Sequence, residues 1–127
     1  MVVDTSALLA LIFRESHGQW VADQLQANRD FLLISSVNYA EVLILTQSRQ
    51  PSLTPQIREG LDRSSIQIVP CTARNSEVAA RARLHLPLNF GDCFAYALAK
   101  EENCALLTLD RDFRNTDIRV ILPRRVS

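Results

Sequence analysis

The strongest constraint on the fold is an alternation of short apolar runs with longer segments of helical periodicity along the whole chain. The apolar runs are too short for helices and are rich in β-branched and aliphatic residues, so they predict strands at 1–4, 31–35, 66–69, 105–109 and 119–122. Helices are predicted between them, at 5–13, 16–28, 37–48, 54–63, 74–85 and 90–101. This order of elements predicts an α/β fold with a parallel sheet of four to five strands flanked by α-helices.

The 127 residues match the size of one ordinary domain, so we expect a single domain over 1–127. The chain is 47% hydrophobic and 22% charged, which excludes disordered and fibrous classes. No apolar run approaches the roughly 20 residues of a membrane span, and no basic segment leads an apolar one at the start. We therefore expect a cytoplasmic protein without membrane association. Pro55 is expected in the first turn of the helix over 54–63.

The charges cancel, with 14 Lys and Arg against 14 Asp and Glu, so a strongly basic nucleic-acid binder is excluded. Lys100 is the only lysine, and the other thirteen cations are arginines, which suit phosphates and carboxylates. The three cysteines are odd in number and contain no C-x-x-C pair, so neither a disulfide framework nor a zinc site is predicted. Each is expected to be a small core residue.

Four acids stand at the edges of apolar runs. Asp4 and Asp110 end predicted strands, and the carboxyl edge of a parallel sheet is where such folds bind ligands. Glu41 interrupts an apolar helix, and Asp92 lies in the first turn of another. Asp112 follows two residues after Asp110. If these acids converge, a cation must hold them together, because like charges a few ångströms apart raise one another's pKa values.

Each acid also has a purely structural interpretation. Asp4 could cap the helix that follows, Asp92 stands where the acid of a capping box would stand after Asn89, and Asp110 with Asp112 could form a polar turn. Glu41 is harder to explain in this way, since a charge on an apolar helix needs a partner. An all-carboxylate set favours Mg²⁺, with Mn²⁺ as a substitute, over Zn²⁺.

Other chemistries find no support in the sequence. His17 and His85 fall outside the acidic motifs, and no Ser-His-Asp or Cys-His arrangement is present. With three glycines the chain lacks both the P-loop and the dinucleotide-binding loop. A signalling receiver domain needs an aspartate after the third strand, where this chain has Pro70 and Cys71, and a haloacid-dehalogenase phosphatase needs D-x-D where this chain has Asp4-Thr5-Ser6.

Four segments resemble the motifs of PIN-domain ribonucleases, and more narrowly those of the VapC toxins of type II toxin–antitoxin modules. They are 2–8, 36–41, 89–99 and 106–113, and the stretch Gly-Asp-Cys-Phe-Ala-Tyr-Ala-Leu-Ala within the third is specific. The resemblance implies magnesium-dependent cleavage of RNA, inhibition by a small cognate VapB-like antitoxin, and a homodimer. The alternative is a non-catalytic or stand-alone RNA-processing PIN-domain protein without an antitoxin.

The resemblance also implies roles for particular residues. Asp4, Glu41 and Asp92 match the three acids that the family shares, and the fourth acid matches Asp110, with Asp112 as a possible substitute. All of them are candidate metal ligands. Thr5 or Ser6 would support the site through a hydroxyl group, and Thr108 is a weaker candidate for the same role.

Arginines are candidates for gripping RNA phosphates. Arg74 and Arg81 are seven residues apart on a predicted helix and share a face, and Arg83 flanks them; further candidates are Arg111, Arg114, Arg124 and Arg125. A solvated charged face explains any one of them equally well. If four acids are neutralised by metal, ten acids remain against fourteen cations. The net charge of zero therefore does not exclude an RNA enzyme.

Overall fold

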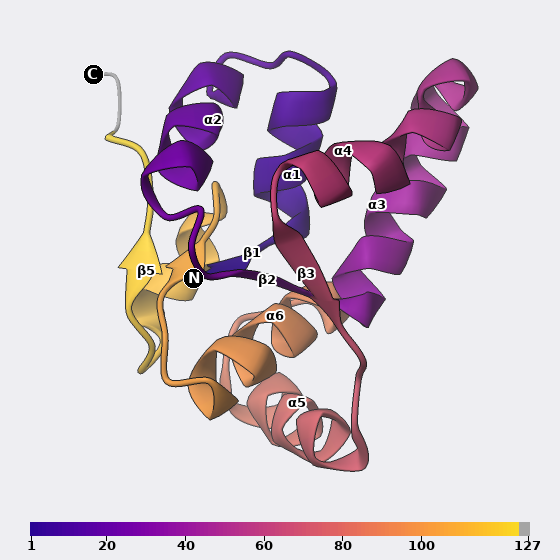
Figure 1. Ribbon diagram of the computed structural model, residues 1–127. Helices are drawn as coiled ribbons and strands as arrows, with labels where there is room; N and C mark the ends of the chain where they lie inside the picture. The colour runs from indigo at the N-terminus through magenta and orange to yellow at the C-terminus, as the bar shows by residue number, and fades with distance from the viewer. Residues whose placement is uncertain (125–127) are drawn as a thin grey trace.

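The computed structural model describes residues 1–124 and has the predicted α/β architecture (Figure 1). Its strands are β1 Val2–Val3, β2 Leu32–Ser35, β3 Ile66–Val69, β4 Leu106–Leu107 and β5 Val120–Ile121. Its α-helices are α1 Thr5–Ile12, α2 Gly18–Ala27, α3 Ser36–Arg49, α4 Ile57–Arg63, α5 Ala73–His85 and α6 Phe90–Glu101. Two 3-10 helices, η1 Pro51–Gln56 and η2 Arg111–Asn115, complete the described part of the chain.

The five strands form one sheet in the order β3-β2-β1-β4-β5, and all four pairings are parallel. The predicted parallel sheet is confirmed. The central strand β1 pairs through Val2 with Leu33 of β2 and with Leu106 of β4. The chain runs outward from β1 to β3 on one side and reaches β4 and β5 on the other, so the strand order reverses between β1 and β4. Such a switch point opens a crevice at the carboxyl ends of the two strands.

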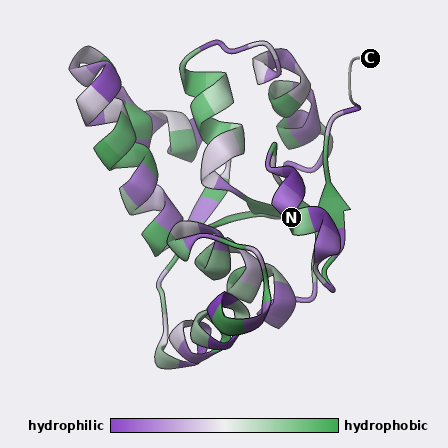
Figure 2. Ribbon diagram, turned by 180° about the vertical axis from the view of Figure 1, so that it is seen from behind, coloured by the Kyte–Doolittle hydropathy of each residue, from purple (hydrophilic) through white to green (hydrophobic). Residues whose placement is uncertain are grey.

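Alternate residues of each strand enter two separate apolar cores, as the period of two in a strand requires. Val3, Ile34 and Leu107 pack on one face with α1, α2, α3 and α4. Val2, Leu33 and Leu106 pack on the other face with α5, α6 and Phe113 of η2. Figure 1 shows the two groups of helices on opposite sides of the sheet, and Figure 2 shows the apolar strands at the centre of the molecule. Both faces are covered, which explains why the strands are mostly apolar on both sides.

Two local predictions were wrong. Pro55 lies inside η1, and α4 begins only at Ile57, because a proline at this position breaks the helical hydrogen-bond pattern. Cys71 is not a core residue: it follows β3 at a partly exposed position beside Thr72 and Ser76. The apolar sequence of α3 is not buried on all sides, since Ile44 is 62% and Leu45 39% exposed. Within residues 1–124, no helix is long and apolar enough to cross a membrane.

Candidate metal centre

The four predicted acids come from four different elements that meet at the switch point. Asp4 follows β1 and Asp110 follows β4, so these two carboxylates flank the crevice directly. Glu41 lies on α3 and Asp92 in the first turn of α6, and these two helices pack against each other. Electrostatic influence links Glu41 to Asp4, and links Asp92 to both Asp4 and Asp110. The fold therefore brings together acids that are up to 106 positions apart in the sequence.

Asp4 is held in place by hydroxyl groups and does not cap α1. It occupies the N-cap position, but its side chain makes no capping bond. Instead Oδ2 accepts hydrogen bonds from Thr108 Oγ1 at 2.7 Å and Ser6 Oγ at 2.8 Å, while Oδ1 is buried without a hydrogen-bond partner in residues 1–124. Burial raises the pKa of the Asp4 carboxyl, against the opposing effect of the two hydroxyls. An unpaired, buried carboxylate oxygen is what a cation would satisfy.

Glu41 is fixed by two donors and a glycine. Its Oε1 accepts from Thr5 Oγ1 at 2.8 Å and from Asn38 Nδ2 at 2.8 Å. Asn38 Nδ2 also donates to the carbonyl of Gly91 at 3.0 Å and so ties α3 to α6. A Cβ atom added at Gly91 would lie 2.1 Å from Glu41 Oε2, far inside van der Waals contact. A side chain at this position would displace the Glu41 carboxylate from its present place.

The carboxyl of Asp92 is strongly perturbed. Asn89 caps α6 by accepting from the Asp92 backbone N–H at 2.9 Å, which leaves the Asp92 side chain free of the capping role. Burial, then the charges of Asp4 and Asp110, then hydrogen bonding to Asp110 raise the pKa of Asp92 from 3.8 to about 8. A carboxyl group whose pKa is raised by burial and by neighbouring acids is typical of functional sites, and a cation would offset the repulsion.

Asp110 and Asp112 have different surroundings. Asp110 interacts with Asp92, and its backbone N–H donates to Thr108 Oγ1 at 2.9 Å. Asp112 lies in η2 and is exposed. Its backbone N–H donates to Asp110 Oδ1 at 2.9 Å. The predicted polar turn is therefore present, but only Asp110 of the pair acts electrostatically on Asp92.

The donor chemistry fits a hard divalent cation, since all four candidate ligands offer carboxylate oxygens and one of these oxygens is buried without a partner. As the side chains lie, no three His, Cys, Asp or Glu residues among 1–124 stand close enough to form a ready ligand set. Binding an ion would therefore draw the carboxylates inward. Both histidines lie elsewhere: His17 precedes α2, and His85 ends α5.

Comparison with known proteins agrees with this arrangement. The PIN domain family model matches residues 1–119. The chain belongs to the PIN-domain family. Its relatives place it among the VapC proteins of that family. Ribonuclease VapC28 of Mycobacterium tuberculosis is 33% identical over 98% of this chain and 100% of its own length. Ribonuclease VapC42 of the same organism is 34% identical over 94% of this chain and 97% of its own length. The resemblance predicted from the motifs is confirmed.

Solved structures show the same fold at lower identity. M. tuberculosis VapC20, a toxin that cleaves the sarcin-ricin loop, superposes with a TM-score of 0.79 at 18% identity, covering 96% of this chain and 98% of its own. The toxin–antitoxin complex from Klebsiella pneumoniae superposes with a TM-score of 0.76 at 20% identity, covering 98% of this chain and 98% of its own. VapBC2 from Rickettsia felis, bound to promoter DNA, gives 0.77 at 17% identity, covering 95% and 96%.

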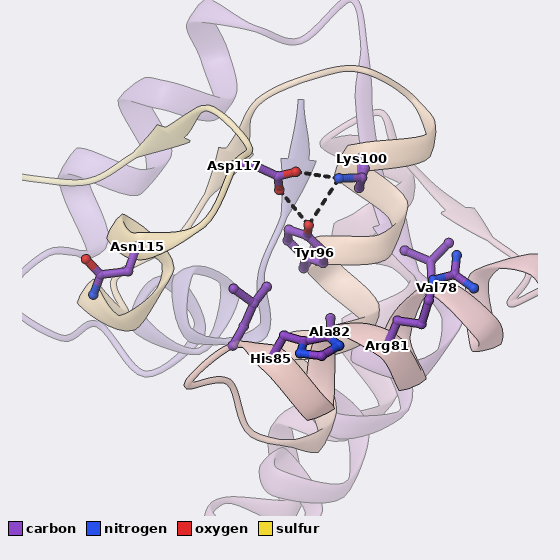
Figure 3. A pocket seen from close by; sticks show the side chains of 9 residues that line it. Val78, Arg81, Ala82, His85, Tyr96, Lys100, Asn115 and Asp117 are labelled. Carbon is purple, nitrogen blue, oxygen red and sulfur yellow. Dashed lines mark hydrogen bonds and ion pairs between the residues drawn. The ribbon is translucent and has the colours of Figure 1, made fainter.

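The predicted RNA-binding arginines lie on different surfaces of the PIN domain. Arg81 lines a cavity of about 490 Å³ at the carboxyl end of α6, together with His85, Tyr96 and Lys100 (Figure 3). Arg83 lines a smaller pocket near the start of α6. Arg74, Arg114 and Arg124 are exposed, Arg111 donates to the Pro123 carbonyl at 3.0 Å, and Arg125 lies outside the described residues. Contact with RNA stays a prediction for all of them.

Sequence reasoning missed Asn38 and the steric role of Gly91. Asn38 is fully buried, three residues before Glu41, so the two side chains meet on one side of α3. A polar residue one helical turn from a charged one on an apolar helix was the available signal. Of the predicted hydroxyls, Thr5 supports Glu41, while Ser6 and Thr108 support Asp4, so the weaker candidate Thr108 has a direct contact.

Proposed function

We propose that this PIN domain is a magnesium-dependent ribonuclease, the toxin of a VapBC-type pair, and that Asp4, Glu41, Asp92 and Asp110 hold the metal. The single observation that carries the proposal is the electrostatic coupling of Asp92 to both Asp4 and Asp110 at the switch point, which together with burial raises the pKa of Asp92 to about 8. The reaction, RNA cleavage, is proposed from the relatives, which are named ribonucleases and match nearly the full length of this chain.

The chain's own residues prepare the site for a cation. Ser6 and Thr108 orient one oxygen of Asp4 and leave the other buried without a partner, and Thr5 and Asn38 orient Glu41 by donating to its Oε1. Hydrogen-bond donors that hold a metal ligand in this way fix the direction of its lone pairs. Asp110 faces Asp92, whereas Asp112 is exposed, so we assign the fourth ligand to Asp110.

Mg²⁺ bound there would neutralise the acids, lower the pKa of the attacking water and stabilise charge on the departing oxygen. Carboxylates alone would repel an RNA phosphate. The side chains position the metal and the phosphodiester; none of them is assigned as a nucleophile. Mn²⁺, with similar oxygen preference, should substitute.

A small VapB-like antitoxin and a second copy of the chain are the proposed partners. Solved structures with the same fold include the toxin–antitoxin complex from Klebsiella pneumoniae and VapBC2 from Rickettsia felis. For self-association, α3 offers the exposed apolar side chains Ile44 and Leu45 on a helix that also carries Glu41. The stand-alone alternative predicts active protein that no adjacent small protein inhibits or accompanies through purification.

The deciding experiment measures cleavage of a fluorescently labelled single-stranded RNA by purified protein with Mg²⁺, with excess chelator, and after Mg²⁺ is restored. We expect cleavage only in the first and third conditions. Asp92→Asn should reduce the rate by about 100-fold or more, because metal-centred stabilisation is worth several kcal/mol. Asp62→Asn, a change at an exposed aspartate of α4, is the matched control and should keep the full rate. Cleavage that survives excess chelator contradicts the proposal.

A further inference from the structure

Asp110 lies on the connection between β4 and β5, which has little regular structure of its own. Residues 108–119 form this connection and include the 3-10 helix η2, and the two strands that it joins are each two residues long. A 3-10 helix has poorer hydrogen-bond geometry than an α-helix and holds its shape less firmly. The position of the Asp110 carboxylate therefore depends on what the rest of the connection contacts.

The first half of the β4–β5 connection is fixed by a hydroxyl group and by an aromatic ring. The Asp110 backbone N–H donates to Thr108 Oγ1 at 2.9 Å. Phe113 is fully buried in the same apolar core as the inner side of α6. Its carbonyl accepts a hydrogen bond from Thr116 Oγ1 at 2.6 Å, which closes the turn after η2. The chain then leaves the core, and its next contact with α6 is made by the residue after this turn, Asp117.

Asp117 fastens the far half of the connection to α6 through two donors (Figure 3). Tyr96 Oη donates to Asp117 Oδ1 at 2.5 Å, and Lys100 Nζ donates to Asp117 Oδ2. Lys100 Nζ also lies 3.4 Å from Tyr96 Oη, so the three side chains form one closed cluster. Tyr96 is buried, but the side chains of Lys100 and Asp117 are 47% and 59% exposed. An ion pair this exposed contributes little to global stability, so its main effect is to fix geometry.

The same side of α6 carries both Asp92 and the donors to Asp117. Asp92, Tyr96 and Lys100 follow one another at intervals of four residues, which places them in successive turns along one side of the helix. A rise of 1.5 Å per residue puts Tyr96 about 6 Å along the axis from Asp92. The β4–β5 connection meets this row twice. Asp110 interacts with Asp92, and seven residues later Asp117 binds the next two members of the row.

We propose that Asp117, held by Tyr96 and Lys100, is a positioning residue of the metal centre: it clamps the β4–β5 connection to α6 and so keeps the Asp110 carboxylate opposite Asp92. The inference rests on the proposed function, because it takes Asp110 as a metal ligand. Asp117 acts through the backbone of 110–117 and is not itself a ligand. Without the clamp, η2 can move away from α6, and the centre loses its fourth carboxylate.

The first measurement is the affinity for Mn²⁺, read by electron paramagnetic resonance. Asp117→Ala removes the acceptor of both donors and should weaken Mn²⁺ binding by about tenfold, the low end of the effect of partners outside the ligand set. Asp117→Asn loses the same charge but keeps an oxygen for the Tyr96 hydroxyl, so it should retain most of the affinity. Glu59→Ala is the matched control: it removes the exposed ion pair with Arg63 on α4 and should leave Mn²⁺ binding unchanged.

Amide hydrogen exchange in the metal-free protein separates positioning from general stability. Asp117→Ala should speed the exchange of the Asp112 N–H, which is bonded to Asp110 Oδ1, and leave exchange in β1 and β2 unchanged. Faster exchange with unchanged Mn²⁺ affinity overturns the inference, as does faster exchange throughout the sheet. Equal losses of affinity in Asp117→Asn and Asp117→Ala also overturn it, because they assign the effect to charge. If the unmodified protein binds no Mn²⁺, the proposed function has failed, and exchange at Asp112 still shows whether the clamp exists.

Discussion

Replacement of Gly91 by alanine gives the most direct test of how the centre is built. In a helix, Gly→Ala normally stabilises a protein by about 0.5–1 kcal/mol, because glycine loses more backbone entropy on folding. Gly60 of α4 has open space around its Cβ position, so Gly60→Ala should show this ordinary gain. At Gly91 the new methyl group would lie 2.1 Å from Glu41 Oε2 and must displace the carboxylate.

The magnitude follows from what Glu41 loses. Its two hydrogen bonds, from Thr5 and Asn38, are each 2.8 Å long and end on a charged group. Such bonds contribute about 1.5–3 kcal/mol each, and the low end applies because Glu41 is only partly buried and can regain water. Two lost bonds at about 1.5 kcal/mol, set against a helical gain of about 1 kcal/mol, leave Gly91→Ala destabilised by about 2 kcal/mol.

Urea unfolding of the metal-free protein measures these differences in the free energy of unfolding, and the fluorescence of the single tryptophan, Trp20, follows the transition. A difference appears as a shift in the urea concentration at the midpoint, while the dependence of the free energy on urea concentration stays constant. In a Glu41→Ala background the clash is gone, and Gly91→Ala should then stabilise the protein as Gly60→Ala does. Equal effects of Gly91→Ala with and without the Glu41 carboxylate would refute the steric reasoning. RNA cleavage should fall in Gly91→Ala and stay unchanged in Gly60→Ala.

Three further outcomes are expected. The pKa of Asp92 is raised from 3.8 to about 8 in the folded protein, so between these two values the folded chain keeps a proton that the unfolded chain has lost. The free energy of unfolding of the metal-free protein should therefore fall from about pH 5 to about pH 8. Mg²⁺ should reduce that loss. A midpoint in urea that rises with pH in chelator would contradict this. Asp110→Asn should abolish RNA cleavage while Asp112→Asn leaves it nearly unchanged, and the reverse result would move the fourth ligand to Asp112. Thr108→Val removes the hydroxyl that donates to Asp4 and accepts from the Asp110 N–H, so thermal unfolding should show a loss of about 2 kcal/mol and cleavage should weaken, whereas an unchanged protein would mean that Ser6 alone orients Asp4.

The elements were predictable because their signals are local. Strands with consecutive apolar residues, such as Leu32 to Ile34 of β2 and both residues of β4, indicate a sheet covered on both faces, and the helices between them follow. Local pattern is insufficient where tertiary packing overrides it. The sequence of α3 is apolar around most of its circumference, but it lies at the side of the sheet and buries only the side that faces α1 and α6, which leaves Ile44 exposed.

The acids themselves were predictable because residue type and position relative to a strand end are written in the chain: Asp4 after the first strand, Asp110 after the fourth. The sequence by itself thus determined the α/β class, the carboxylate chemistry and the family. Only the tertiary structure decided which atoms act together. Asn38 reaching Gly91, Thr108 reaching Asp4, and a glycine beside Glu41 are contacts between segments 50 to 104 positions apart. No local periodicity encodes such contacts, because they exist only once parallel strands have aligned their carboxyl ends and two helices have closed over them.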